Sequence, residues 1–444
     1  MNSDTRMISP LPQILFRFVT PVLSSLVLFA GLNSADAQLV NGRLVSSLYT
    51  WEQFDTVGVS KSYARGMQSF LLDVGQGSIS LHTHLQVAGT LRKTLDEEPD
   101  FRSYYLYFKV RDIADVVDVS FGRLPYFAGV GNGTLDGALA TVRLAENRVR
   151  VTAYGGARTP QELTLNGWSS LDKNFVTGGQ VLALFDQARV GLSYVNRQRE
   201  RAPYWALRSD SLFNPVETFI TPDALKEQFL SLDATYRFSA MRAYGRYDYD
   251  LFGSKTQRGQ VSLSYDLTDR LSLSGDFIHR APRVAFNSFF ALFAASSINE
   301  YQLGGDYRLD PSWRVFLRGA FVDYTDDESI RYTVGVAHTY GGISYRGSTG
   351  YAGEQNFVSV YGAYPLFERM VMPTASVTFG SYKLNDTAPR DNALAVALGA
   401  TIRPIQAISV DLQAQGISNK IVDQDIRFFG KFTYWFSETL SLFE

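Results

Sequence analysis

The chain has 444 residues, and its 42 Lys and Arg nearly balance its 44 Asp and Glu. This balance gives no case for a nucleic-acid partner, which would require a basic surface. Cys is absent, which excludes disulfides and thiolate metal sites, whereas aromatic residues, at 14%, are unusually frequent.

The N-terminus has the pattern of a secretory signal. Arg6 and Arg17 precede a short apolar run, Phe18–Leu32, and Ala35-Asp36-Ala37 supplies a small-residue cleavage site. A membrane-anchor helix is the alternative, but the run is short and interrupted by proline and serine. We therefore predict a cleaved signal peptide over residues 1–37 and one exported domain over 38–444. No later segment has the roughly 20 apolar residues of a membrane helix, so any membrane span must be built from strands.

Alternation of polar and apolar side chains recurs along the mature chain. Between Met241 and Leu251, charged residues fall on one parity and mostly Tyr, Ala and Leu on the other. Successive side chains of a strand point to opposite faces, so this segment has a polar face and an apolar face. Similar segments predict strands at Leu44–Gln53, Gln68–Asp73, Ser78–Ala88, Tyr104–Arg111, Val117–Gly122, Leu139–Leu144, Arg148–Tyr154, Val176–Leu184, Arg189–Arg197, Phe229–Phe238, Gln260–Leu267, Leu271–Arg280, Glu300–Leu309, Trp313–Asp323, Arg331–Thr339, Ile343–Ser348, Val358–Tyr364, Thr374–Leu384, Ala393–Ile402, Ala407–Gln415 and Arg427–Phe436.

The predicted fold class is all-β, a transmembrane up-and-down antiparallel β-barrel of about 22 strands, within a range of 18 to 22. A soluble propeller or sandwich is the alternative, because its strands alternate in the same way. Strand lengths near ten residues, aromatic residues all along the chain and alternating short and long connections favour the membrane barrel. Short turns at every second connection predict both termini in the periplasm.

The last predicted strand supports an outer-membrane location. Ile426–Phe436 is rich in aromatic residues and resembles the closing strand that outer-membrane proteins present to their assembly machinery. That family pattern ends the chain on an aromatic residue, whereas here Ser437–Glu444 follows, with Phe443 penultimate. The partners expected from this resemblance are outer-membrane lipid or lipopolysaccharide and the barrel assembly machinery.

The polar parity of a membrane barrel faces the lumen, and here it is rich in Arg. The pore-lining candidates are Arg148, Arg150, Arg237, Arg242, Arg246, Asp248, Asp276, Arg280, Asp306, Arg308, Arg314, Arg318 and Lys431, and Arg331 and Arg346 share their parity. Rings of Arg favour anions in a pore. The alternative is that these residues hold the inner wall together, with Arg246 paired to Asp248 or Asp276 and Arg308 to Asp306.

Two segments are candidates for a constriction. Leu124–Gly137 is Gly-rich, follows Gly122-Arg123 and ends in Asp136-Gly137; it supplies Tyr126, Phe127, Asn132 and Asp136 as constriction residues. The second, Val284–Ser297, is an apolar loop whose Phe289 and Phe290 we expect to fold inward, local packing against other loops being the alternative.

The first of these segments resembles the corresponding region of alginate-export-type and related substrate-selective bacterial porins. A strand that ends in Gly-Arg, a Gly-rich loop and an Asp-Gly pair carry this resemblance, over about twenty residues. The resemblance implies an 18-strand barrel with an Arg-lined path for anionic sugars.

Enzyme chemistry has little support in the sequence. His82 and His84 share one strand face, which is typical of polar lining rather than a metal site. A Gly-x-Ser-x-Gly motif is missing, and no Ser and His are singled out as a pair, so we predict neither an enzyme nor a catalytic, metal or cofactor site. The sequence predicts a porin, an outer-membrane channel for passive diffusion of small hydrophilic, anionic solutes. The alternative is a barrel sheath for a periplasmic partner protein, such as a multihaem cytochrome in an electron conduit.

Overall fold

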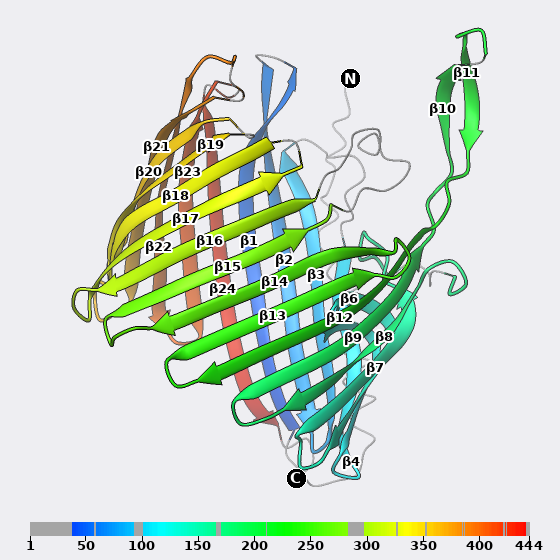
Figure 1. Cartoon of the computed structure of the whole chain (residues 1–444). Coiled ribbons are helices and arrows are strands. Elements are labelled where there is room, and N and C mark those ends of the chain that lie inside the picture. The colour runs from blue at the N-terminus through cyan, green and yellow to red at the C-terminus, as the bar shows by residue number, and fades with distance from the viewer. Residues whose placement is uncertain are drawn as a thin grey trace, which may run out of the picture.

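Segments with period-two alternation form the strands of one closed sheet in a computed structural model of the chain (Figure 1). The structure describes residues 38–440 apart from 57–58, 93–100, 166–169, 210, 283–296, 326, 351–352, 384, 386, 421 and 423. The barrel strands are β1 (Gln38–Thr56), β2 (Val59–Gln76), β3 (Ile79–Arg92), β4 (Phe101–Ile113), β5 (Val117–Ala128), β6 (Gly131–Leu144), β7 (Val149–Arg158), β8 (Phe175–Leu184), β9 (Ala188–Arg199), β12 (Leu225–Phe238), β13 (Met241–Asp250), β14 (Lys255–Asp266), β15 (Leu271–Arg280), β16 (Ile298–Arg308), β17 (Trp313–Tyr324), β18 (Asp327–His338), β19 (Gly341–Gly350), β20 (Gln355–Ala363), β21 (Val371–Tyr382), β22 (Asp391–Ile405), β23 (Ile408–Ser418) and β24 (Asp425–Leu440).

Each of these 22 strands pairs antiparallel with its neighbours, and β24 pairs with β1 to close the ring. The closing register runs from Gln38 opposite Leu440 to Tyr49 opposite Phe429. Every predicted strand overlaps one barrel strand, so the predicted barrel of about 22 strands is confirmed. The 18 strands implied by the porin resemblance are wrong for this chain.

Large apolar side chains cover the outer face of the barrel. Leu303 on β16 is 75% exposed, Leu317 on β17 is 60% exposed and Phe428 on β24 is 56% exposed. Their chain neighbours on the opposite face include Gln302, Arg318 and Arg427, and extensive apolar exposure on one face marks a surface that contacts lipid. We call the opposite, polar face of the strands the lumen face. Within the described part of the chain, no helix is long and apolar enough to cross a bilayer.

A hairpin between β9 and β12 was not predicted from the sequence. β10 (Tyr204–Ser209) and β11 (Pro215–Ile220) pair with each other and not with the barrel. The two strands project beyond the rim of the barrel (Figure 1), and Trp205 meets Phe219 with ring centroids 5.0 Å apart. This excursion belongs to one of the long connections predicted on the outer side.

The predicted signal peptide, residues 1–37, lies outside the described residues, and the first described strand begins at Gln38. Phe289 and Phe290, the candidates of the second constriction segment, also lie outside the described residues. The first constriction segment, Leu124–Gly137, is described in full and is an extension of strands β5 and β6.

Candidate functional site: an inward hairpin and an arginine wall

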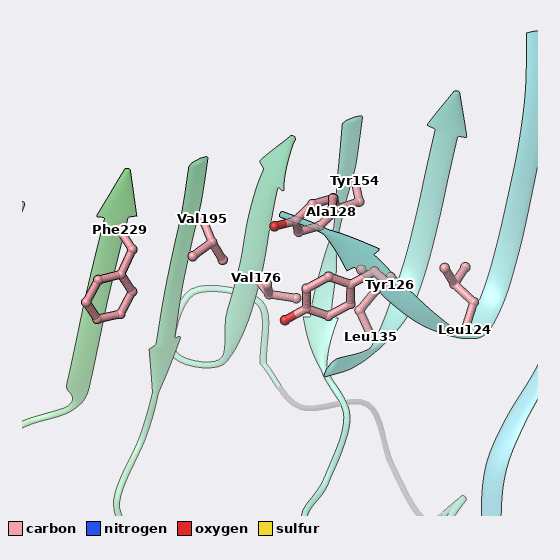
Figure 2. Packing of buried hydrophobic residues seen from close by; sticks show 8 residues of the cluster. All are labelled: Leu124, Tyr126, Ala128, Leu135, Tyr154, Val176, Val195 and Phe229. Atoms are coloured by element: carbon pink, nitrogen blue, oxygen red, sulfur yellow. The ribbon is translucent and has the colours of Figure 1, made fainter. Parts of the chain in front are cut away.

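The end of the β5–β6 hairpin, residues 124–135, packs against the lumen face of other strands. Its Leu124, Tyr126, Ala128 and Leu135 form a buried cluster with four wall residues: Tyr154 on β7, Val176 on β8, Val195 on β9 and Phe229 on β12 (Figure 2). These wall residues share their strand faces with Thr152, Gln180, Ser193 and Asp233. Since that polar face lines the lumen, the hairpin end lies inside the barrel.

Close backbone contacts at glycines allow the hairpin to leave the wall. Gly122 has φ +124, and a Cβ there would lie 2.5 Å from the carbonyl oxygen of Leu106. A Cβ on Gly137 would lie 2.3 Å from the carbonyl oxygen of Gly155. Glycine avoids both the strained backbone and the clash at Gly122, and the clash at Gly137, so these positions fix where the ribbon can bend.

A buried ion pair holds the base of the hairpin. The guanidinium of Arg123 contacts both carboxylate oxygens of Asp136, with Nε–Oδ1 at 2.7 Å and Nη2–Oδ2 at 2.9 Å. The Arg123 side chain is only 6% exposed. Its Nη1 donates to the carbonyl oxygens of Ser103, Leu163 and Thr164 at 3.0–3.2 Å. A bidentate pair with three further acceptors compensates the burial of both charges and ties the hairpin to β4 and to the β7–β8 connection.

The β7–β8 connection is held at its other end as well. Lys173 donates to Glu200, which follows β9, at 2.7 Å. This hydrogen bond and the charge of the carboxylate raise the pKa of Lys173 above its ordinary value. The β7–β8 connection, which accepts hydrogen bonds from Arg123, is therefore also linked to the segment that follows β9.

The tip of the hairpin is fixed to β9. The backbone N–H of Val130 donates to Ser193 Oγ at 2.9 Å, and the rings of Tyr126 and Tyr154 stack with centroids 4.5 Å apart. Phe127 and Asn132 are cross-strand partners on the opposite face of the hairpin and are exposed, Phe127 by 81%. The hairpin therefore presents one apolar face to the wall and a second, open face.

The four constriction candidates of this segment thus divide into two pairs. Tyr126 and Asp136 are buried, Tyr126 in the apolar cluster and Asp136 in the ion pair, so they hold the hairpin rather than present themselves to solvent. Phe127 and Asn132 are on the open face. Arg123, which anchors the hairpin, was read in the sequence only as part of the Gly-Arg motif.

An arginine-rich wall, β15–β19, occupies another sector of the lumen face. Glu300 contacts Arg280, at 3.4 Å, and also Arg331. Asp306 contacts Arg318 at 2.5 Å and Arg314 at 3.5 Å. Four arginines thus share two carboxylates, and Arg346 on β19 has no ion pair within the described chain.

A groove of about 720 Å³ runs along this wall. It is lined by Asp306, Arg314, Arg318, Arg331 and Arg346, together with uncharged residues of β16–β20. Positive side chains therefore outnumber carboxylates around an open, water-accessible space, which lowers the electrostatic energy of an anion there.

Several other predicted lumen cations are paired with acids. Arg246 contacts Asp248 at 2.8 Å, as the wall-stabilising interpretation expected. Further pairs are Arg242 with Asp266 at 3.1 Å and Lys431 with Asp411 at 3.0 Å. The expected pair of Arg308 with Asp306 is wrong, since Asp306 contacts Arg314 and Arg318 instead. Of the remaining candidates, Arg148, Arg150, Arg237, Arg308 and Asp276 have no ion pair among the residues that the structure describes.

Three acids on the lumen face were not predicted from the sequence. Glu300 is the clearest case, because it shares the parity of Gln302 and Asp306 and could have been found by counting back along the strand. Glu227, which contacts Arg197, and Asp425, which contacts Arg427, were missed in the same way. The lumen is therefore less basic overall than predicted, although four arginines line the groove of the arginine-rich wall.

No protein-family model and no curated protein matches the sequence. Among solved structures, the chain is similar to OccAB4 of Acinetobacter baumannii, with a TM-score of 0.43 and 10% identity over 91% of this chain and 99% of that one. It is similar to OccK7 (OpdD) of Pseudomonas aeruginosa, with a TM-score of 0.43 and 8% identity over 91% of this chain and all of that one. It is also similar to the translocation pore of the P pilus usher PapC, with a TM-score of 0.43 and 10% identity over 90% and 100% of the two chains.

Proposed function

We propose that this barrel is a bacterial outer-membrane porin, a channel through which small hydrophilic solutes diffuse passively, and that it prefers anions. The closed antiparallel ring satisfies every strand edge, and the apolar outer face suits lipid. The polar inner face suits water and dissolved solutes. The observation that carries the anion preference is the pair of carboxylates, Glu300 and Asp306, shared by four arginines beside an open groove.

The arginines of this wall are able to meet a solute because their side chains are exposed to water, although the two shared carboxylates, Glu300 and Asp306, are only 13% and 22% exposed. Arg280, Arg314 and Arg331 are 58%, 56% and 48% exposed. Exposed ion pairs are worth at most about 1 kcal/mol, so a passing carboxylate or phosphate can replace one partner at small cost. Weak contact at several neighbouring cations lets an anion enter and also leave, which passive conduction requires.

The inward hairpin gives the channel its narrow part. It occupies the lumen in front of β7, β8, β9 and β12 and is anchored at its base and at its tip. The path for solutes then runs between the open face of the hairpin, with Phe127 and Asn132, and the rest of the wall. A fixed hairpin, rather than a mobile loop, sets the size limit of the pore.

The test is single-channel conductance of the refolded protein in a planar bilayer with a salt gradient. We expect steady conductance and a reversal potential that shows anion preference. Replacement of Arg331 and Arg346 together by Gln should reduce this preference. Arg208→Gln, on the β10–β11 hairpin outside the barrel, removes the same kind of charge from an exposed position and should leave the preference unchanged.

Two results would contradict the proposal. A cation-preferring reversal potential would reject the role of the arginine wall and leave a general channel. A protein that inserts fully but never conducts would reject the channel, and would favour a sheath that needs a periplasmic partner. Pull-down of periplasmic proteins with the intact barrel would then be the next measurement. We also expect the barrel assembly machinery to act on β24, the aromatic-rich closing strand.

A further inference from the structure

A chain of three hydrogen-bonded side chains lies on the lumen face of β2 and β3, outside the hairpin and the arginine wall. Ser80 Oγ is 2.9 Å from His82 Nε2, and His82 Nδ1 is 2.5 Å from Asp73 Oδ1. Ser80 and His82 are two residues apart on β3 and so share a face, and Asp73 on β2 is the direct register partner of His82. Serine on one imidazole nitrogen and carboxylate on the other is the arrangement of a serine hydrolase triad.

The imidazole of His82 is held in this orientation from three sides. Tyr107 on β4 is its other register partner, and the two rings stack with centroids 4.9 Å apart and planes 20° apart. Asp73 accepts from Nδ1, and this assignment leaves the lone pair of Nε2 directed at the Ser80 hydroxyl. A base fixed in both tautomer and rotamer is what general-base catalysis needs.

Ser80 has different register partners on its two neighbouring strands. Lys109 on β4 is its register partner on one side, so a cationic residue neighbours the serine on the same face of the sheet. Gly75 on β2 is its partner on the other side and contributes no side chain. Ser80 itself is only 4% exposed, which restricts access to small acyl groups.

We propose that Ser80, His82 and Asp73 form a second site in this barrel, a nucleophilic serine site that hydrolyses small esters. Ser80 Oγ attacks the ester carbonyl carbon while its proton passes to His82 Nε2. The carbon–oxygen bond to the alcohol then breaks, and the alcohol leaves with the proton from His82. Water, deprotonated by His82, releases the acid from acyl-Ser80, and the proton returns to the serine. Ser80 and His82 are catalytic residues, and Asp73 is a positioning residue.

His84 offers an internal control for this site. It lies two residues further along the same face of β3 and also stacks on a tyrosine, Tyr104, with ring centroids 4.4 Å apart. Within the described residues it has neither a serine nor a carboxylate on its ring nitrogens. His84 lies on the same face but lacks the triad contacts. Comparison of its variant with the His82 variant therefore distinguishes triad catalysis from the reactivity of an ordinary imidazole.

The experiment uses the refolded full barrel with p-nitrophenyl acetate as the probe. Release of p-nitrophenolate gives the rate, and mass spectrometry of intact protein and peptides locates the acetyl adduct. We expect acetylation at Ser80. The rate of p-nitrophenolate release should fall by about 10²-fold or more in both Ser80→Ala and His82→Gln. His84→Gln should keep the wild-type rate and adduct. Asp73→Asn should lower the rate and alter its dependence on pH, which a purely structural residue would not do.

Far-ultraviolet circular dichroism of every variant in lipid vesicles shows that the barrel has folded, so a loss of rate is not confused with loss of structure. The proposal is overturned if the wild-type protein shows no acetyl-Ser80, or if Ser80→Ala hydrolyses the ester as fast as the wild type. An equal loss in His82→Gln and His84→Gln would also overturn it, because the reaction would then be that of exposed imidazoles. Conductance and ester hydrolysis are independent readouts, so failure of this site leaves the channel proposal untouched.

Discussion

Two sectors of the same barrel use inward-facing side chains in opposite ways. In the sector from β5 to β12, the lumen face carries Tyr154, Val176, Val195 and Phe229, which bury themselves under the β5–β6 hairpin. In the sector from β15 to β19, four arginines of the lumen face, Arg314, Arg318, Arg331 and Arg346, line an open groove. The charged pair of the first sector, Arg123 with Asp136, is nearly inaccessible, whereas Arg280, Arg314 and Arg331 of the second are about half exposed or more.

The difference shows that burial determines the role of an ion pair. A buried pair that loses one partner leaves a charge without water, so it behaves as a structural lock. A wet pair loses little when a partner is exchanged, so it behaves as a reversible contact for solutes. The polar parity of a strand therefore identifies the lumen but not the role of a residue there.

Removal of one partner of the buried Arg123–Asp136 ion pair should have the largest effect on stability. Asp136→Ala leaves the buried guanidinium of Arg123 without its carboxylate, and we expect the hairpin to lose about 3–5 kcal/mol of local stability. Hydrogen exchange of the amides in 124–135 measures this loss, and the single-channel conductance should rise and become noisy. Asp266→Ala, which unpairs the half-exposed Arg242, is the matched change and should cost at most about 1 kcal/mol. If amide exchange in residues 124–135 were no faster in Asp136→Ala than in Asp266→Ala, the contrast between buried and exposed ion pairs would be contradicted.

A methyl group at the bend should have the next largest effect. In Gly137→Ala the new Cβ would meet the Gly155 carbonyl oxygen at 2.3 Å, and we expect a cost of about 1–3 kcal/mol as the hairpin shifts. Gly319→Ala, on β17, has no atom within 4 Å of the new Cβ and serves as the control. Urea unfolding in lipid vesicles compares the two. If both variants match the wild type, the bend does not depend on close backbone contact.

A change on the arginine wall should alter selectivity more than stability. Glu300→Gln frees Arg280 and Arg331 from their shared carboxylate, so the reversal potential in a salt gradient should move towards stronger anion preference. The free energy of unfolding should change by less than about 1 kcal/mol. A shift towards cations, or none, would show that this wall does not line the conducting path.

The smallest effect on stability is expected on the open face of the hairpin. Phe127 is 81% exposed, so Phe127→Ala should change the free energy of unfolding by no more than about 0.5 kcal/mol. Conductance should nevertheless increase, because the ring is removed from the narrow part of the channel. Unchanged conductance with unchanged stability would place the narrowest point elsewhere.

The barrel itself was predictable because its signal is local and repeated. Each strand carries its own alternation and its own turn, so strands such as Met241–Asp250 are found without knowledge of their partners. The Gly-rich sequence of Leu124–Gly137 made it a candidate for a constriction, but alternation did not predict how the hairpin folds inward. Alternation from Phe121 places Arg123 on the lipid side, and only contacts with distant residues, such as the Leu163 carbonyl and Ser193, show that the ribbon has left the wall.

The Ser80–His82–Asp73 chain escaped the sequence analysis for a related reason. Ser80 and His82, two apart on one strand, have the same pattern as ordinary polar lining, and Asp73 comes from the neighbouring strand. Only the register of β2 against β3 brings the carboxylate to the imidazole. Register depends on pairing between strands, so no spacing within a single segment reveals such a site.

The pairing of the first strand with the last has a consequence for how the molecule forms. Twelve residue pairs join β1 to β24, and Ser437 Oγ donates to Asn41 Oδ1 at 2.6 Å across a sequence separation of 396 residues. Contacts between residues so far apart in the sequence have a large entropic cost of loop closure and form slowly. Until the last strand arrives, β1 and the growing end each present unpaired N–H and C=O groups, which are templates for aggregation. Loss of β24 would therefore leave two open edges rather than a smaller barrel, and assembly has to wait for the whole chain.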